Sequence, residues 1–376
     1  MILKLIILFS SFNFSNAKIV HREKTQDYNI VLKEMASDLH IPWGMEFLNK
    51  NTLLVNQKNG KMILIDLKTG KKTNITHSVS VTEKGQGGSM DVVKHPNYPT
   101  TPWIYWTYVS KDKGQLFTNI ARFQLKKNKM IQFEKLMSKT KSKSDTSRHF
   151  GSRIAFDHKG FLYFSIGDRG HRPNGQNLKT HAGSILRLHD DGRIPKDNPF
   201  VNSKEALPEI WSYGHRNPQG LSYDPVEKKL WVIEHGPRGG DEINLVEKGK
   251  NYGWATISYG KEYYAPIAVG ESTHQKGMEQ PVHHYIPSIA PCGMAVYQGR
   301  MFPKWQGSLL SGALKLTHLN RVELKNGQFV KEERLLKSFS QRIRHVKQAP
   351  DGSVFISTDS GQILKILMAK APVKSI

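Results

Sequence analysis

The chain is almost free of cysteine. Cys292 is the only one among 376 residues, so no disulfide can form within the chain. A single thiol suits an exported protein, and we expect Cys292 to be a small buried apolar side chain. Long apolar runs are absent as well, because no stretch approaches the roughly 20 residues that a membrane-spanning helix needs. The sequence therefore excludes a disulfide scaffold and helical membrane spans.

The first 17 residues differ from the rest. Lys4 precedes the short apolar run 5–9, and residues 15–17 have the small side chains of a cleavage site. We predict a signal peptide at 1–17 and a periplasmic or secreted mature chain at 18–376. A buried N-terminal strand is the alternative interpretation.

Positive charge is plentiful but not concentrated. The formal net charge is +23, and it comes mainly from lysines spread along the whole chain. Such a surface attracts anions weakly and in a salt-dependent way. Since no basic arm or nucleic-acid-binding module is present, we predict a solvated basic surface and no nucleic-acid partner.

The local patterns indicate β-structure. Apolar stretches with helical period are scarce, whereas short β-branched and aromatic runs bounded by turn residues recur. Six of them share one pattern and lie at 52–55, 103–106, 161–164, 230–233, 308–310 and 354–356. Their spacing, roughly 45 to 80 residues, suits a four-stranded propeller blade with variable loops. We predict an all-β fold, a single six-bladed β-propeller of four-stranded antiparallel blades, and rank a β-sandwich second.

Two further expectations follow from a propeller. The strand at 29–32 should pair with the C-terminal segment 362–366, because closing the ring removes exposed strand edges. Loops at one end of a propeller converge on its axis. Functional residues should therefore come from several short polar segments.

One such segment contains His149, just before an expected inner strand, and Asp168 follows that strand in a Gly-Asp-Arg-Gly turn. A histidine whose ring is held by a carboxylate is suited to act as a general base near neutral pH. A structural hydrogen bond between the two is the alternative.

Glycine and proline are dense in 211–220 and 234–242. Backbone carbonyls outside a β-ladder are good ligands for a hard cation such as calcium. Asp241 and Glu242 either support a second calcium or cap a turn.

Cationic residues appear again near the C-terminus. Lys315 follows an apolar strand, and Arg342 and Arg344 alternate, so both arginines should point to one side of a strand. Two cations on one face repel unless an anion lies between them, and bidentate arginines suit carboxylates. An exposed basic strand face is the alternative.

Taken together, these segments resemble the soluble aldose sugar dehydrogenases that use pyrroloquinoline quinone, a family related to soluble quinoprotein glucose dehydrogenase. The resemblance runs from 41–44 to 358–359. Its specific parts are 85–88 (GQGG), 148–153 (RHFGSR), 176–183, 214–220 (GHRNPQG) and 234–242 (EHGPRGGDE). The family's six-bladed propeller agrees with the repeat count.

The resemblance implies residue roles. His149 matches the general base, Asp168 its orienting partner, and Gln86 a neighbour of the quinone and the sugar. The residues that match those holding the quinone are Arg216, Asn217, Lys315, Arg342 and Arg344, with Arg216 also placed to favour negative charge on the reacting oxygen. Gly236 and Pro237 match carbonyl ligands of an active-site calcium, and Glu242 and Tyr252 match ligands of a second, structural calcium.

The implied reaction is oxidation of an aldose at C1 to the lactone, with PQQ and Ca2+ as cofactors and an external electron acceptor. A calcium-dependent propeller lactonase and a non-catalytic sugar- or protein-binding propeller are the alternatives. The preferred sugar, the acceptor and the oligomeric state are left open by the sequence.

Overall fold

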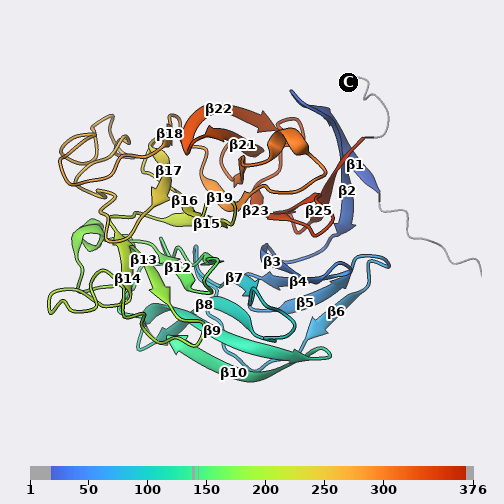
Figure 1. Ribbon diagram of the computed structural model, residues 1–376, viewed down its shortest axis with the longest axis horizontal. Coiled ribbons are helices and arrows are strands. Elements are labelled where there is room, and N and C mark those ends of the chain that lie inside the picture. Colours follow the sequence, from blue (N-terminus) through green and yellow to red (C-terminus); the bar gives the residue numbers. More distant parts are fainter. Residues whose placement is uncertain (1–17, 138–139, 143, 370–376) are drawn as a thin grey trace, which may run out of the picture.

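The computed structural model describes residues 18–137, 140–142 and 144–369, and these residues form six antiparallel sheets around a common centre (Figure 1). The predicted signal peptide at 1–17 lies outside the described residues. Five sheets have four strands and the sixth has five. The predicted six-bladed propeller is thus confirmed, with one correction: the closing blade carries an extra strand.

We number the blades along the chain. Blade 1 is β3 (Pro42–Asn49), β4 (Thr52–Gln57), β5 (Met62–Asp66) and β6 (Lys72–Ile75); blade 2 is β7 (Ser89–Lys94), β8 (Ile104–Asp112), β9 (Gln115–Lys126) and β10 (Lys129–Met137). Blade 3 is β11 (Ile154–Phe156), β12 (Leu162–Ile166), β13 (Ser184–Leu188) and β14 (Ile210–Tyr213). Blade 4 is β15 (Pro218–Asp224), β16 (Lys229–Glu234), β17 (Asp241–Val246) and β18 (His283–Tyr285).

Blade 5 is β19 (Pro291–Val296), β20 (Leu309–Ala313), β21 (His318–Lys325) and β22 (Gln328–Leu335). Blade 6 is β23 (Ile343–Gln348), β24 (Val354–Thr358), β25 (Ile363–Met368), β2 (Asn29–Ala36) and β1 (Ile19–Lys24). The short 3-10 helices η1 (Arg172–Gln176) and η2 (Pro303–Trp305) lie in loops. No helix in the described part of the chain is long and apolar enough to cross a membrane.

The six apolar runs fall on the second strand of each blade: β4, β8, β12, β16, β20 and β24. Every residue of β12, β20 and β24 is buried. A strand that is covered on both faces needs apolar side chains in continuous runs, and this is why these strands stand out in the sequence.

The apolar core is divided among the interfaces between blades. One cluster, for example, joins Tyr163 and Ile185 of blade 3 to Val232 and Leu230 of blade 4. Another joins Met45 and Phe47 of blade 1 to Phe355 and Ile363 of blade 6. Each blade therefore buries its apolar surface against two neighbours, so the ring must close to complete the core.

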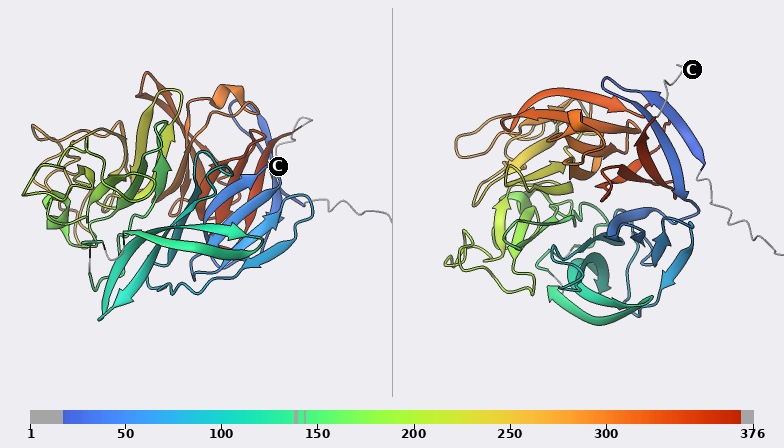
Figure 2. Two further views of the ribbon diagram at one scale, coloured as in Figure 1. Left: turned by 60° about the horizontal axis from the view of Figure 1, so that its bottom comes forward. Right: turned by 45° about the vertical axis from the view of Figure 1, so that its right-hand side comes forward.

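Closure is made by the N-terminal segment, as predicted. β2 pairs antiparallel with β25, with Leu32 opposite Ile366, and β1 adds itself outside β2. Figure 2 shows the blue N-terminal strands beside the red C-terminal ones. The turn between β1 and β2 is tied to blade 5, because buried Arg321 bonds Asp27 at 3.1 Å and Glu333 at 3.0 Å.

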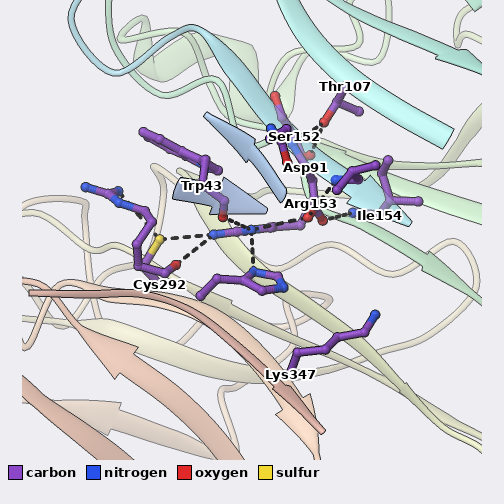
Figure 3. A network of polar contacts seen from close by, with 12 residues as sticks. Trp43, Asp91, Thr107, Ser152, Arg153, Ile154, Cys292 and Lys347 are labelled. Atoms are coloured by element: carbon purple, nitrogen blue, oxygen red, sulfur yellow. Dashed lines mark hydrogen bonds and ion pairs between the residues drawn. The ribbon is translucent and has the colours of Figure 1, made fainter. Parts of the chain in front are cut away.

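Arg153, directly before β11, lies fully buried at the centre of the ring (Figure 3). Its guanidinium contacts all five other inner strands. It donates to the carbonyl oxygens of Trp43, Gln219 and Arg344 at 3.3, 2.8 and 3.0 Å. It also contacts Asp91 Oδ1 at 3.4 Å, His345 Nδ1 at 2.8 Å and Cys292 Sγ at 3.3 Å. A single side chain thus joins all six blades.

The partners of Arg153 are buried too. Burial raises the pKa of Asp91, although the Arg153 charge and backbone N–H groups oppose this. Burial and the Arg153 charge hold the pKa of His345 well below its ordinary value, so its ring is neutral and accepts a hydrogen bond. Cys292 is buried as expected, but its surroundings are cationic and not apolar, because Arg344 also contacts its sulfur.

Candidate active site

The candidate residues gather at one end of the ring. His149 and Arg216 lie just before the inner strands β11 and β15, while Asp168 and Gly236 follow the second strands β12 and β16. The first two strands of a blade are antiparallel, so the start of one and the end of the other lie together. This corrects the prediction of one strand between His149 and Asp168: two strands, forming a hairpin, bring them to the same end.

His149 and Asp168 are in direct contact. His149 Nδ1 lies 2.6 Å from Asp168 Oδ1, and the same oxygen accepts the Gly170 N–H at 2.7 Å. Gln86 does not touch the ring but accepts the backbone N–H of His149 at 2.7 Å. The φ of His149 is +53°, a left-handed conformation that histidine adopts at a cost. The surrounding bonds hold this strained residue in place.

The electrostatics favour a neutral histidine beside an ionised aspartate. Burial lowers the pKa of His149; the Asp168 hydrogen bond opposes this shift and the nearby Arg216 charge adds to it. Burial alone would raise the pKa of Asp168, but the His149 bond and the Arg216 charge hold it below its usual range. A neutral ring that donates from Nδ1 to a carboxylate leaves Nε2 free to take a proton.

Arg216 and Asn217 lie in the loop that enters β15. Arg216 donates to the carbonyl oxygens of Gly236 at 2.7 Å and His235 at 3.1 Å. Asn217 is buried, and its side-chain oxygen accepts the Gly151 N–H at 3.3 Å. Asn217 therefore also supports the backbone that carries His149.

His235 lies among the candidate cations. Burial lowers its pKa to about 3, and the positive charges of Arg216 and Arg344 add to the shift. Its Nε2 is 2.7 Å from the Pro291 carbonyl oxygen, to which the neutral ring donates. Arg344 is the second residue of the inner strand β23, so it lies at the same end of the ring as Arg216, which shortly precedes the inner strand β15.

This neutral, partly buried histidine makes stability pH-dependent. In the unfolded chain His235 takes up a proton near pH 6.5, but the folded chain resists until about pH 3. The unfolded state then binds more protons, so the free energy of unfolding falls with falling pH. We expect His235 to account for a fall of about 2 kcal/mol in the free energy of unfolding between pH 7 and pH 5, measured by urea unfolding. The variant H235Q should show a loss smaller by that amount, and an equal loss in both proteins would contradict the assignment.

Arg342 and Arg344 share an anion, but it comes from the protein itself. Both bind Asp359, Arg342 Nε at 2.8 Å from Oδ2 and Arg344 Nε at 2.7 Å from Oδ1. Arg344 is buried, whereas the Arg342 side chain is 50% exposed. Lys315 follows β20 with its side chain exposed, and within the described residues its side chain forms no hydrogen bond or ion pair with the other candidates.

Three of the four candidate calcium ligands, Gly236, Glu242 and Tyr252, line a small cavity together with Arg216 and Glu234. The Tyr252 hydroxyl already donates to the Leu245 carbonyl at 2.5 Å, which leaves its backbone carbonyl as the atom that can bind a cation. Pro237 is not at this cavity's wall, and its carbonyl accepts from Ser288 at 3.2 Å.

The donor set of this cavity fits a hard cation. Burial and the neighbouring Glu234 raise the pKa of Glu242 well above its usual range, and a cation between the carboxylates would relieve this. Within the described ranges no three His, Cys, Asp or Glu side chains cluster as a metal site. Backbone carbonyls would therefore have to supply part of the coordination.

An anionic cofactor also fits this end of the ring. Two buried donors, Arg216 Nε and Trp43 Nε1, have no hydrogen-bond partner among the described residues. Trp43 is stacked by Arg344, whose guanidinium carbon lies 4.2 Å from the ring centre. Unpaired buried donors beside arginines are the groups that bind carboxylates.

Sequence reasoning missed three residues of the site. Asp359 pairs with both C-terminal arginines, Trp43 packs on Arg344, and Trp254 donates its indole N–H to Asp168 Oδ2 at 2.7 Å. Trp43 and Trp254 lie in blades or loops distant in the chain from their partners, whereas Asp359 follows the β23–β24 hairpin, 15 residues after Arg344.

A six-bladed propeller with a histidine–aspartate pair and arginines at one end of its axis is the architecture expected of a propeller dehydrogenase. Comparisons with known proteins agree. A family model described as Glucose / Sorbosone dehydrogenase matches residues 39–365. The chain therefore belongs to the glucose/sorbosone dehydrogenase family.

Individual relatives cover nearly the whole chain. Aldose sugar dehydrogenase YliI of Escherichia coli is 38% identical over 334 residues, which cover 86% of this chain and 89% of that protein. The crystal structure of the soluble E. coli aldose sugar dehydrogenase in the apo-form has a TM-score of 0.87 at 35% identity, covering 90% of this chain and 100% of that one. The PQQ-bound form of aldose sugar dehydrogenase from Streptomyces coelicolor has a TM-score of 0.75 at 25% identity, covering 90% and 98%.

Proposed function

We propose that the protein oxidises aldose sugars at C1 to the lactone, with pyrroloquinoline quinone and calcium as cofactors. The observation that carries this is the buried His149–Asp168 pair, 2.6 Å apart, at the end of the ring where Arg216 and Arg344 gather. Family membership and the PQQ-bound relative support the choice of cofactor.

The cationic residues would hold the carboxylates of the quinone. Arg216 has a buried N–H to offer, and Arg344 is fixed by Asp359 and Trp43. Lys315 and Arg342 would add positive charge, while Asn217 supports the His149 backbone from below. When bound, the quinone would supply the hydride acceptor, and a calcium held by the carbonyls of Gly236 and Pro237 would supply a Lewis acid.

The chain's own contribution to the chemistry is proton transfer. Nε2 of His149 takes the proton of the C1 hydroxyl as the C1–H bond breaks and the carbonyl of the lactone forms. Asp168 stabilises the resulting imidazolium through Nδ1. Arg216 would favour negative charge on the reacting oxygen of the quinone. The electron pair would finally pass to an external acceptor. Glu242 and Tyr252 would bind a second, structural calcium.

Reconstitution tests this proposal. Purified chain 18–376 is treated with a chelator, loaded with PQQ and Ca2+, and mixed with a redox dye and a panel of aldoses. We expect dye reduction that needs the quinone, the metal and the sugar together. If the fully loaded protein failed to reduce the dye with every aldose of the panel, the proposal would be overturned.

The same preparation separates the alternative functions. A lactonase would hydrolyse lactones without quinone, and a binding propeller would do neither reaction. The centre of the ring is filled by Arg153 and carries no cage of carboxylates among the described residues, so we favour neither alternative.

We also propose that residues 18–376 act as a single exported catalytic domain. The support is the apolar segment at 1–17 and the single cysteine of the whole chain. Its partners would then be an aldose and an external electron acceptor.

A further inference from the structure

We propose that Trp254 is a positioning residue for His149: its indole N–H fixes the Asp168 carboxylate in the orientation that holds His149 as the Nδ1–H tautomer. This inference rests on the proposed role of His149 as the base, and Trp254 does not itself touch the reacting atoms.

The contacts of Asp168 divide between its two oxygens. Oδ1 receives His149 Nδ1 at 2.6 Å and the Gly170 N–H at 2.7 Å. Oδ2 receives the Trp254 indole N–H at 2.7 Å, and this is its only hydrogen bond within the described residues. Because Asp168 is 1% exposed, water cannot easily replace that donor. The indole therefore decides which way the carboxylate plane faces.

Trp254 is itself firmly held. Its backbone N–H donates to the Gly214 carbonyl at 2.9 Å, and its own carbonyl accepts from Gln176 Nε2 at 2.8 Å. Gly175 packs so closely that an added Cβ would lie 2.2 Å from the Trp254 carbonyl oxygen. The backbone that carries the indole is thus anchored by contacts independent of Asp168.

The tautomer matters because only one form can act. With the proton on Nδ1, Nε2 has a free lone pair for the C1 hydroxyl proton; with the proton on Nε2, it has none. A rotated carboxylate would no longer select the active form. The neutral ring would then divide between two tautomers.

The test is the variant W254F, which keeps an aromatic ring and deletes the N–H. In 15N spectra of the cofactor-free protein, wild-type His149 should be wholly the Nδ1–H tautomer, whereas W254F should show a mixture of tautomers. In the loaded enzyme kcat should fall about tenfold or more, with little change in the KM of the sugar. An unchanged tautomer in W254F would overturn the inference, whatever the activity.

W211F is the matched control. Trp211 lies in blade 3, and its indole N–H has no hydrogen-bond partner in the part of the chain that the structure describes. We expect its His149 spectrum to match the wild type, and a mixture of tautomers there would count against a specific role of Trp254.

A reciprocal measurement keeps the inference testable if W254F does not fold. The indole N–H of Trp254 should be protected from exchange in wild type and lose that protection in D168A, which removes the acceptor. Equal protection in both proteins would overturn the inference. Absence of activity in the loaded wild-type protein would instead refute the proposed function. The tautomer measurements need neither quinone nor sugar, so the two failures can be told apart.

Discussion

Replacing His149 with alanine should lower kcat for aldose oxidation by about 10²–10⁴-fold in the quinone-loaded protein. The side chain offers the only base in contact with Asp168 among the described residues, and its removal leaves the C1 hydroxyl proton without an acceptor. Dye reduction under saturating sugar measures the effect. The free energy of unfolding should fall as well, because alanine keeps the Cβ that makes the left-handed backbone at position 149 costly and the buried Asp168 carboxylate loses its histidine partner.

The variant H158A provides the control. His158 lies in the turn of the same β11–β12 hairpin, at the opposite end from His149, where it is exposed and contacts the Tyr223 hydroxyl. Its activity should equal that of wild type. A sugar-dependent rate in H149A within a few-fold of wild type would rule out the assigned base.

Replacing Arg153 with methionine should lower the free energy of unfolding by about 3–5 kcal/mol. Methionine keeps much of the volume but leaves Asp91 as a buried, unpaired carboxylate and frees the carbonyls of three inner strands. Urea unfolding followed by tryptophan fluorescence measures the loss. The double variant R153M/D91N should recover part of it, because the uncompensated charge is then gone.

The surface variant R193M is the control for the stability lost in R153M. The Arg193 side chain is 75% exposed and pairs only with Asp191 two residues away, so its removal should change stability by no more than about 0.5 kcal/mol. If R153M unfolded at the same urea concentration as R193M, the axial contacts would not stabilise the ring.

The fold was predictable where burial imposes a strong pattern. Runs such as 161–164 and 354–356 belong to strands covered on both faces, and their continuous apolar side chains revealed the six blades. The outer strands gave no such signal: β22 alternates weakly and β1 is half exposed along its length. The fifth strand of blade 6 was therefore missed.

The site was predictable only in part, for a related reason. Local segments identified His149 and Asp168, but not the hairpin that joins them. Trp254 lies in the loop between β17 and β18, and its contact with Asp168 depends on how two blades meet. Asp359 reaches Arg344 across the β23–β24 hairpin of a single blade. Arg153 lies in segment 148–153, one of those that carry the resemblance, yet nothing local distinguishes an axial arginine from a solvated one.

The pairing of β2 with β25 has a consequence for the order of synthesis. Glu34 and Gln362, which bond across this junction, are 328 residues apart in the chain. At ribosomal speed the first strand waits roughly 15 to 70 seconds for its neighbour to be made. Until then blade 6 is incomplete and its edge is open to wrong partners. A nascent chain of this design would benefit from a chaperone that shields its beginning until its last strand emerges.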